Sequence, residues 1–296
     1  MSRSTDLGEI KQVELPQGTL RYRERGAGRP VVFIHGLLVN GDLWRKVVPR
    51  LSPHLRCIAP DLPLGAHEVA MKPDADLTTR GLARLIADLL ETLDLRDVVL
   101  VANDSGGAIV QFVATEHAER VGAIVLTSCD AYDHFPPPLF KPLVLLAHVP
   151  SLLAFALRVL GTRPLRRLPL VFGWLTKRPI DDFYADGYLQ PLVRNAGVRR
   201  DACKFMNDAH PRQTRDVATR LGRFDRPVLI AWAAEDRLFP VSSARRLAKD
   251  FPNARLELIK DCYTFVPEDQ PGPLADLILK HASTASCSPA TVAAAG

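Results

Sequence analysis

Short apolar runs that end at turn residues alternate along the chain with segments of helical spacing. The runs typical of strands lie at 20–25, 31–34, 57–60, 98–101, 123–127, 228–232 and 256–259. Leucine and isoleucine recur every three or four residues within 77–95, and further helices are expected over 106–119, over 242–250 and after Pro273. Strands that alternate with helices predict an α/β fold with a parallel sheet covered on both faces.

The alternation is interrupted once, over a segment with apolar, proline-punctuated stretches and no convincing strand. The pattern therefore predicts a core of 18–130 and 216–281, an inserted helical cap of 131–215 and a disordered tail of 282–296. Such a cap would cover the end of the sheet at which open α/β folds bind ligands. We expect its apolar side chains to form a cap core and a pocket lining, which would include Leu139, Leu143, Leu145, Leu146, Phe155 and Phe172.

Positive charge is concentrated in the predicted cap. The chain carries a net charge of +5, and 132–215 holds 13 Lys and Arg against 6 Asp. Such a segment can attract nucleic acid, a membrane surface or an anionic substrate, but it also fits an ordinary solvated helix face. No aromatic residues interleave with the charges as they do in RNA-binding segments, so we expect no nucleic-acid partner.

The remaining composition limits the cellular setting and the cofactors. Five cysteines without CxxC or Cys/His spacing indicate reduced thiols in a cytoplasmic protein and no metal site. The N-terminus is too polar for a signal peptide. The most apolar stretch, 142–157, is too short to span a bilayer. No Rossmann glycine pattern or P-loop occurs, so no cofactor is expected, and nothing indicates an oligomeric state.

A strand that runs directly into the letters NDSGG and then into a helix is the setting of a nucleophile elbow. This turn is so tight that small residues must stand two positions before and two positions after the nucleophile. With Asp104 in the centre, these positions are Ala102 and Gly106; with Ser105 in the centre, the bulkier Asn103 would occupy one of them. Sterics therefore favour Asp104 as the nucleophile.

Four segments, in order, resemble the α/β-hydrolase superfamily, nearest the branch that contains haloalkane dehalogenases and epoxide hydrolases. They are FIHGL at 33–37, with Trp44 beyond it, the Asp104 elbow, WAAEDRLFP at 232–240 and TFVPEDQP at 264–271. The resemblance covers about 18–281 and implies an α/β-hydrolase fold with an inserted cap.

By this resemblance, Asp104 is the nucleophile and Asp236 is the acid of the catalytic triad. The backbone N–H groups of Leu37 and Ser105 would form the oxyanion hole. Haloalkane dehalogenases hold the leaving halide with side-chain N–H groups, commonly Asn and Trp, at these same two positions. Because the chain has leucine and serine there, it is not expected to be a plain dehalogenase.

The larger departure is Thr264, which stands where the family has its general-base histidine. An ionised aspartate attacks carbon without a base, but the ester that results needs a base for its hydrolysis. A serine nucleophile needs the base even to attack, so a conventional esterase or lipase is disfavoured.

Several residues are candidates for substrate contact or for the missing histidine's role, namely His35, Trp44, His67, Asp130, Tyr184 and Tyr188. His67 follows a strand end on the elbow's side of the sheet. Asp130 directly follows a strand, where some family members place their acid. Epoxide hydrolases use cap tyrosines as acids, although packing explains the spacing of Tyr184 and Tyr188 equally well.

Three functions remain open. The first is an Asp104-nucleophile hydrolase of a small hydrophobic organic substrate, an epoxide or related electrophile, with an unusual replacement for the histidine. The second is a cofactor-free lyase, isomerase or cyclase that uses Asp104 as acid–base. The third is a non-catalytic protein that binds a ligand in the same pocket.

Overall fold

The computed structural model describes residues 4–285 and contains an eight-stranded sheet in the order β1-β2-β4-β3-β5-β6-β7-β8. The strands are β1 (Glu9–Leu15), β2 (Gly18–Arg25), β3 (Pro30–Ile34), β4 (Arg56–Pro60), β5 (Val98–Asp104), β6 (Val121–Cys129), β7 (Val228–Ala233) and β8 (Ala254–Ile259). The β1–β2 and β2–β4 pairs are antiparallel, and the others are parallel. The predicted, mostly parallel sheet is confirmed.

The seven predicted strands correspond to β2–β8, whereas β1 was not predicted. Within β1 only Val13 and Leu15 are buried, because the strand lies at the edge of the sheet and pairs with β2 alone. An edge strand with so little buried surface lacks the apolar run that identified the others.

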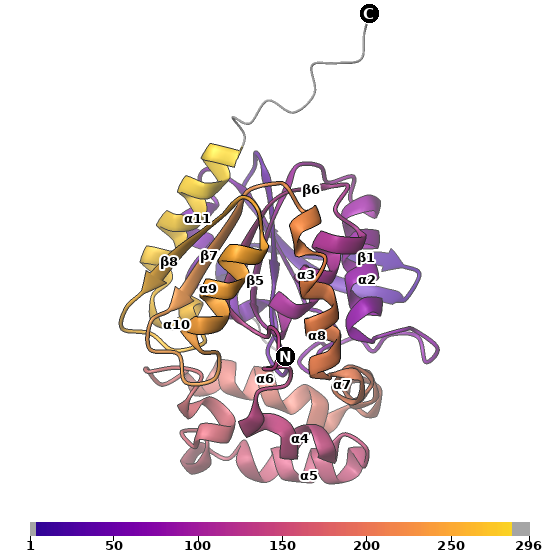
Figure 1. Cartoon of the computed structure of the whole chain (residues 1–296). Coiled ribbons are helices and arrows are strands. Elements are labelled where there is room, and N and C mark those ends of the chain that lie inside the picture. Colours follow the sequence, from indigo (N-terminus) through magenta and orange to yellow (C-terminus); the bar gives the residue numbers. More distant parts are fainter. Residues whose placement is uncertain (1–3, 286–296) are drawn as a thin grey trace, which may run out of the picture.

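Helices cover both faces of the sheet (Figure 1). Those of the core are α1 (Val48–Leu51), α2 (Thr79–Thr92), α3 (Ser105–Glu116), α8 (Pro211–Ala218), α9 (Val241–Asp250), α10 (Val266–Asp269) and α11 (Pro271–Ala285). α2, α3 and α8 pack side by side, and α1 packs against α11. α2 begins later than predicted because the Thr78 side chain accepts a hydrogen bond from the Gly81 N–H and caps the helix.

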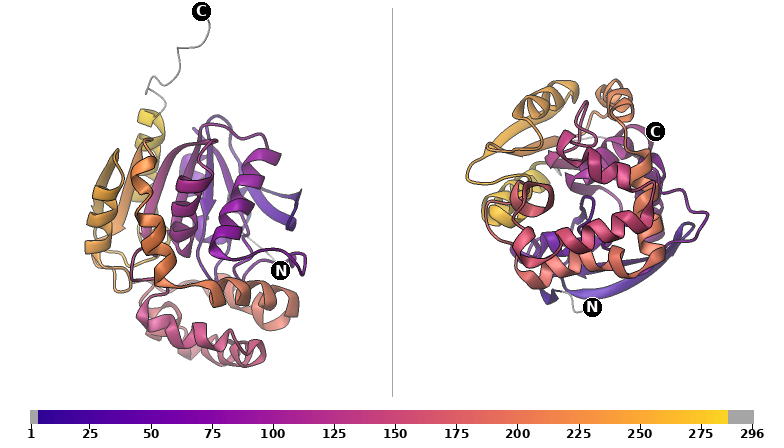
Figure 2. Two further views of the ribbon diagram at one scale, coloured as in Figure 1. Left: turned by 45° about the vertical axis from the view of Figure 1, so that its right-hand side comes forward. Right: turned by 90° about the horizontal axis from the view of Figure 1, so that it is seen from below.

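Four further helices lie between β6 and β7 and cover one end of the sheet (Figures 1 and 2). They are α4 (Lys141–Leu146), α5 (Pro150–Leu160), α6 (Asp182–Arg194) and α7 (Ala196–Asp208), with a π-helical turn at Pro169–Gly173. α8 starts within the segment predicted as cap but packs on α3 of the core. None of the helices in the described part of the chain is long and apolar enough to cross a membrane.

The predicted tail boundary was wrong by a few residues, because α11 continues to Ala285. The rest of that predicted tail, 286–296, lies outside the described residues.

Candidate active site

The junction of β5 and α3 has the geometry of a nucleophile elbow. Asp104 has φ 54° and ψ −133°, a backbone conformation that residues other than glycine rarely adopt. A Cβ atom at Gly106 would lie 2.5 Å from the carbonyl oxygen of Ile34, so only glycine fits two positions after Asp104. A Cβ atom at Gly36 would lie 2.1 Å from Asp104 Oδ2, so this glycine makes room for the carboxylate.

The Asp104 carboxylate lies in the predicted oxyanion hole. The backbone N–H groups of Ser105 and Leu37 donate hydrogen bonds to it. Burial and the charge of Asp236 nevertheless raise the pKa of Asp104 to about 7, against the lowering effect of the two donors. At neutral pH, Asp104 is therefore protonated in some molecules and ionised in the others.

Asp130 follows β6, the strand that pairs with β5. Its backbone N–H donates to the Asp104 carbonyl oxygen over 3.3 Å, so the two residues are neighbours at the same sheet edge. Its side chain is buried at 1% exposure; it accepts a hydrogen bond from the Ser105 side chain, and its Oδ1 has no hydrogen-bond partner among the described residues. Burial and the nearby charge of Asp104 raise the pKa of Asp130 well above its usual value. Asp130 therefore holds its proton to a higher pH than an ordinary aspartate does.

Asp236 is held by the loop that follows β7. Its Oδ1 accepts hydrogen bonds from the N–H groups of Leu238 and Phe239, each at 2.8 Å, and from Thr264 Oγ1 at 3.0 Å. Burial raises the pKa of Asp236, although these donors stabilise its charged form. In the family the histidine would bridge this carboxylate and the nucleophile; here the threonine hydroxyl takes the place beside Asp236 and is itself fully buried.

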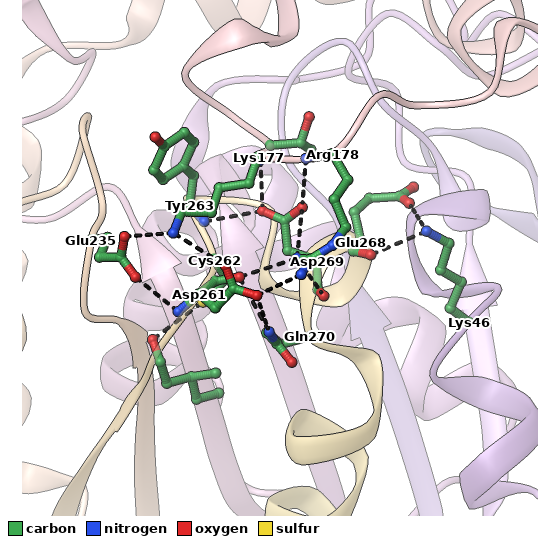
Figure 3. A network of polar contacts seen from close by, with 12 residues as sticks. Lys46, Lys177, Arg178, Glu235, Asp261, Cys262, Tyr263, Glu268, Asp269 and Gln270 are labelled. Carbon is green, nitrogen blue, oxygen red and sulfur yellow. Dashed lines mark hydrogen bonds and ion pairs between the residues drawn. The ribbon is translucent and has the colours of Figure 1, made fainter.

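A polar network fixes the Thr264 loop against the cap (Figure 3). The buried Asp269 carboxylate accepts hydrogen bonds from the backbone N–H groups of Lys177, Arg178 and Tyr263, at 2.9, 3.1 and 3.1 Å. The side chains of Lys177 and Arg178 also form ion pairs with Asp261. The backbone N–H of Phe265 in this loop donates to the carbonyl oxygen of Leu175 in the cap over 2.7 Å.

A pocket between the sheet end and the cap contains Asp104. It encloses about 810 Å³ of empty space, counted with its opening to solvent. The side chains of Asp104, Ser105 and Asp130 are the polar ones that line it. The others are apolar, namely those of Leu37, Leu38, Val39, Phe135, Pro136, Pro137, Phe140, Leu143, Val144, Leu157, Leu160, Leu170, Val171, Phe172, Leu175, Leu189, Phe205, Met206, Ala209 and Phe265. No histidine lines this pocket. Such a site suits an apolar organic molecule that presents a reactive group to the carboxylates.

Comparison with known proteins agrees with this architecture. Residues 31–277 match the model of a family described as "Alpha/beta hydrolase family". The chain belongs to the α/β-hydrolase family.

Its relatives include the "Uncharacterized hydrolase YugF" of Bacillus subtilis, 28% identical over 85% of this chain and 87% of that protein. Another is the "Cis-3-alkyl-4-alkyloxetan-2-one decarboxylase" of Shewanella oneidensis, 26% identical over 88% of this chain and 83% of the relative. Among solved structures, haloalkane dehalogenase DbeA from Bradyrhizobium elkani has a TM-score of 0.78 at 16% identity, covering 95% of this chain and 99% of that one. Epoxide hydrolase CorEH has a TM-score of 0.75 at 21% identity, covering 93% and 99%.

The predicted superfamily and fold are thereby confirmed, and the chain is an enzyme of the α/β-hydrolase superfamily; haloalkane dehalogenases are among the proteins that it is similar to.

Within this α/β hydrolase, several candidate residues have structural contacts away from the pocket. The His35 ring donates from Nδ1 to the Gly36 carbonyl at 2.9 Å and accepts the Leu62 N–H at Nε2. Trp44 is fully buried and packs on Phe33, with ring centroids 5.1 Å apart. None of these side chains lines the pocket, so the structure does not place His35 or Trp44 against a substrate there.

His67 and the two cap tyrosines also lie outside the pocket. His67 Nε2 is 3.2 Å from Asp201 Oδ2 of α7, so it joins the core to the cap. The Tyr188 hydroxyl accepts a hydrogen bond from the Arg45 guanidinium at 3.4 Å, and that guanidinium stacks on the Tyr184 ring 3.8 Å from its centroid. Arg45 pairs in turn with the buried Glu268. Packing and cap attachment therefore account for these residues.

The predicted pocket lining was partly wrong. Leu143 and Phe172 line the pocket, but Leu139 lines a neighbouring groove instead. Leu145 and Phe155 are 68% and 64% exposed on the outer side of the cap. Leu146 packs in the cap's own core. The apolar, proline-punctuated stretches predicted a helical cap but not which of their apolar side chains turn inward.

Asn103 was considered only for its size, yet it organises the site. Its Nδ2 donates hydrogen bonds to Thr127 Oγ1 at 2.8 Å, to the Ser128 carbonyl at 3.2 Å and to the Thr264 carbonyl at 2.8 Å. It thereby joins β5, β6 and the Thr264 loop. Its place beside Asp104 was the available signal, but its partners lie far away in the sequence.

Proposed function

We propose that the enzyme hydrolyses a small apolar electrophile of the epoxide type, with Asp104 as nucleophile and Asp130 in place of the family histidine. The observation that carries this proposal is the pair of carboxyl groups that, with Ser105, form the polar part of an apolar pocket; the pKa of Asp130 is raised, and its Oδ1 has no partner among the described residues.

In the first half-reaction, the Asp104 carboxylate attacks a ring carbon of the epoxide and the ring C–O bond breaks. The ring oxygen takes the proton of the Asp130 carboxyl group and becomes a hydroxyl. Asp104 is then a hydroxyalkyl ester, and Asp130 is a carboxylate. A neutral buried carboxyl is suited to this step because an ionised one has no proton to give.

In the second half-reaction, the Asp130 carboxylate removes a proton from water, whose oxygen adds to the ester carbonyl carbon of Asp104. The N–H groups of Leu37 and Ser105 stabilise the oxyanion that forms. When the intermediate collapses, the diol leaves as an alkoxide and takes the proton of the new Asp104 carboxylic acid. Asp104 is again a carboxylate, Asp130 is again protonated, and one epoxide and one water have become one diol.

A labelling experiment tests both halves. A single turnover of styrene oxide in ¹⁸O-water should place the label in the Asp104 carboxylate and leave the diol unlabelled, because water attacks the ester and not the substrate. Peptide mass spectrometry locates the label. A label that enters the diol in the first turnover, with none on Asp104, would show direct attack of water on the ring and contradict the nucleophile role.

A second candidate is a lyase, favoured by the relative named as an oxetanone decarboxylase and by the absence of a histidine from the pocket. Loss of carbon dioxide from a dialkyl β-lactone leaves an alkene and consumes no water. A dialkyl β-lactone converted to alkene and carbon dioxide, with no ¹⁸O in products or protein, would favour this candidate over the hydrolase.

A further inference from the structure

The outer face of the cap carries a row of large apolar side chains in contact with solvent. Of the nine most exposed large apolar residues in the described chain, six lie on or beside α4 and α5: Leu145 (68%), Val149 (51%), Leu152 (47%), Phe155 (64%), Val159 (43%) and Leu168 (41%). Within α5 they recur every three or four residues and so share one side of the helix. We call these six residues the outer cap face.

The opposite side of α5 is also apolar. Leu153 and Leu157 are buried there, and Leu157 and Leu160 line the pocket. A helix that is apolar on all sides normally has packing partners on all sides. Isolated surface leucines are ordinary, but a gathered exposed patch marks an interaction site. Within residues 4–285, nothing therefore covers the outer cap face.

The charge around this face limits what the partner can be. The segment 135–168 contains Lys141, Arg158, Arg163, Arg166 and Arg167 and no Asp or Glu. Arg163 and Arg166 are paired with acidic residues of α6. Lys141 and Arg158 are exposed and form no ion pair within residues 4–285. Free cations beside exposed aromatic and aliphatic side chains are the signature of a helix that lies on an anionic lipid surface.

We propose that the outer cap face docks on the surface of a bilayer that contains anionic phospholipid. A second copy of the chain fits less well, because a two-fold contact through this face would bring the same cations together. α4 and α5 lie at the end of the molecule away from the sheet, so that a flat surface can reach them (Figures 1 and 2).

The docked orientation has a consequence for substrate supply. The inner sides of α4 and α5 contribute Leu143, Val144, Leu157 and Leu160 to the pocket, while their outer sides would touch the lipid. The pocket would then lie one helix diameter, ~10 Å, from the membrane surface. A sparingly soluble substrate dissolved in the lipid would enter the cap without a long path through water.

Vesicle co-sedimentation of the full chain tests the proposal without reference to the reaction. We expect binding to vesicles of phosphatidylcholine with phosphatidylglycerol, and weaker binding to phosphatidylcholine alone. The double variant L152S/F155S should bind at least about tenfold more weakly, because each side chain loses the apolar area that it inserts. The double variant K141Q/R158Q should lose about fivefold for each charge removed, on the anionic vesicles only.

The matched control is I10S/L258S, which replaces two exposed apolar residues of the edge strands β1 and β8, 54% and 44% exposed, and leaves α4 and α5 unchanged. It should bind like the unaltered chain, and all variants should keep their thermal unfolding midpoint because the substituted side chains are exposed. Equal losses in control and cap variants, or no vesicle binding at all, would overturn the proposal. So would a concentration-dependent dimer in sedimentation equilibrium that L152S/F155S dissociates, because the second copy would then be the partner.

Discussion

Asp130 and Asp236 both follow strands of the same sheet, and both interact electrostatically with Asp104, yet their surroundings differ. Asp236 Oδ1 accepts three hydrogen bonds, two from backbone N–H groups and one from Thr264. Asp130 accepts one from Ser105. Each carboxyl group keeps one oxygen without a partner among the described residues, Oδ2 of Asp236 and Oδ1 of Asp130. Asp130 lines the pocket that contains Asp104, whereas Asp236 lines a neighbouring groove. The two residues therefore differ in the number of their donors and in their access to the pocket.

Our proposal accordingly assigns proton transfer to Asp130 and not to Asp236, which occupies the position of the family acid. Several hydrogen-bond donors stabilise the charged form of a carboxylate, as they do at Asp236. A buried carboxyl group with few donors and a raised pKa is better suited to hold and donate a proton. The four predictions that follow test this contrast in order of decreasing effect.

Replacing the nucleophile should have the largest effect. Asp104→Ala removes the group that forms the ester, so we expect turnover to fall at least about 10⁴-fold and no covalent adduct to form. Intact-mass measurement after mixing with styrene oxide checks the adduct. Ser105→Ala is the matched control, because it keeps the backbone N–H of the oxyanion hole. A control variant as inactive as Asp104→Ala would make Ser105 the nucleophile.

Asp130→Asn should slow turnover by about 10²- to 10⁴-fold, the usual contribution of one general acid–base. Because the asparagine can neither donate a proton to the ring oxygen nor take one from water, both half-reactions should slow, and the steady-state turnover of styrene oxide measures the loss. Asp236→Asn, the comparison variant, should retain more activity. If the Asp236 variant were instead the more damaged of the two, the contrast between the carboxyl groups would be wrong.

The pH dependence should report the electrostatic link to Asp236. Attack requires the Asp104 carboxylate, whose pKa is raised to about 7, so kcat/KM should rise with pH through about 7. The charge of Asp236 helps to raise that pKa, so Asp236→Asn should move this rise to lower pH. At still higher pH the rate should fall as Asp130 loses its proton. An unmoved rise in the variant would mean that the two carboxyl groups do not interact.

The smallest effect is expected at Thr264. Thr264→Val keeps the shape but removes the hydroxyl that donates to Asp236, which should cost about 1 kcal/mol in the free energy of unfolding. Urea denaturation measures this difference. Activity should change little, because the hydroxyl does not contact the pocket. A large loss of kcat with unchanged stability would assign the threonine a direct part in catalysis.

The fold was largely predictable because its signals are local. Seven strands of the sheet, the elbow and the interrupted alternation at the cap all follow from short-range periodicity and from turn sterics. β1 was missed because an edge strand buries too few residues to make such a signal. The sequence placed Asp104, Asp130 and Asp236 at or just after the ends of strands, where the structure also has them, and their roles stay predictions. His67, Tyr184 and Tyr188 were unresolved because their partners, Asp201 and Arg45, lie more than 100 residues away in sequence.

The sequence alone therefore shows which residue types stand at the ends of the strands: an aspartate at the elbow, a carboxylate after β7 and a threonine, Thr264, where the family has its histidine. The pKa of each carboxyl group depends on the tertiary structure. Burial, the number of hydrogen-bond donors and the distance to other charges control protonation, and all three depend on segments that meet only in the folded chain. For the same reason, the apolar stretches predicted a helical cap, but tertiary packing determines which apolar side of α4 and α5 faces the pocket and which faces outward.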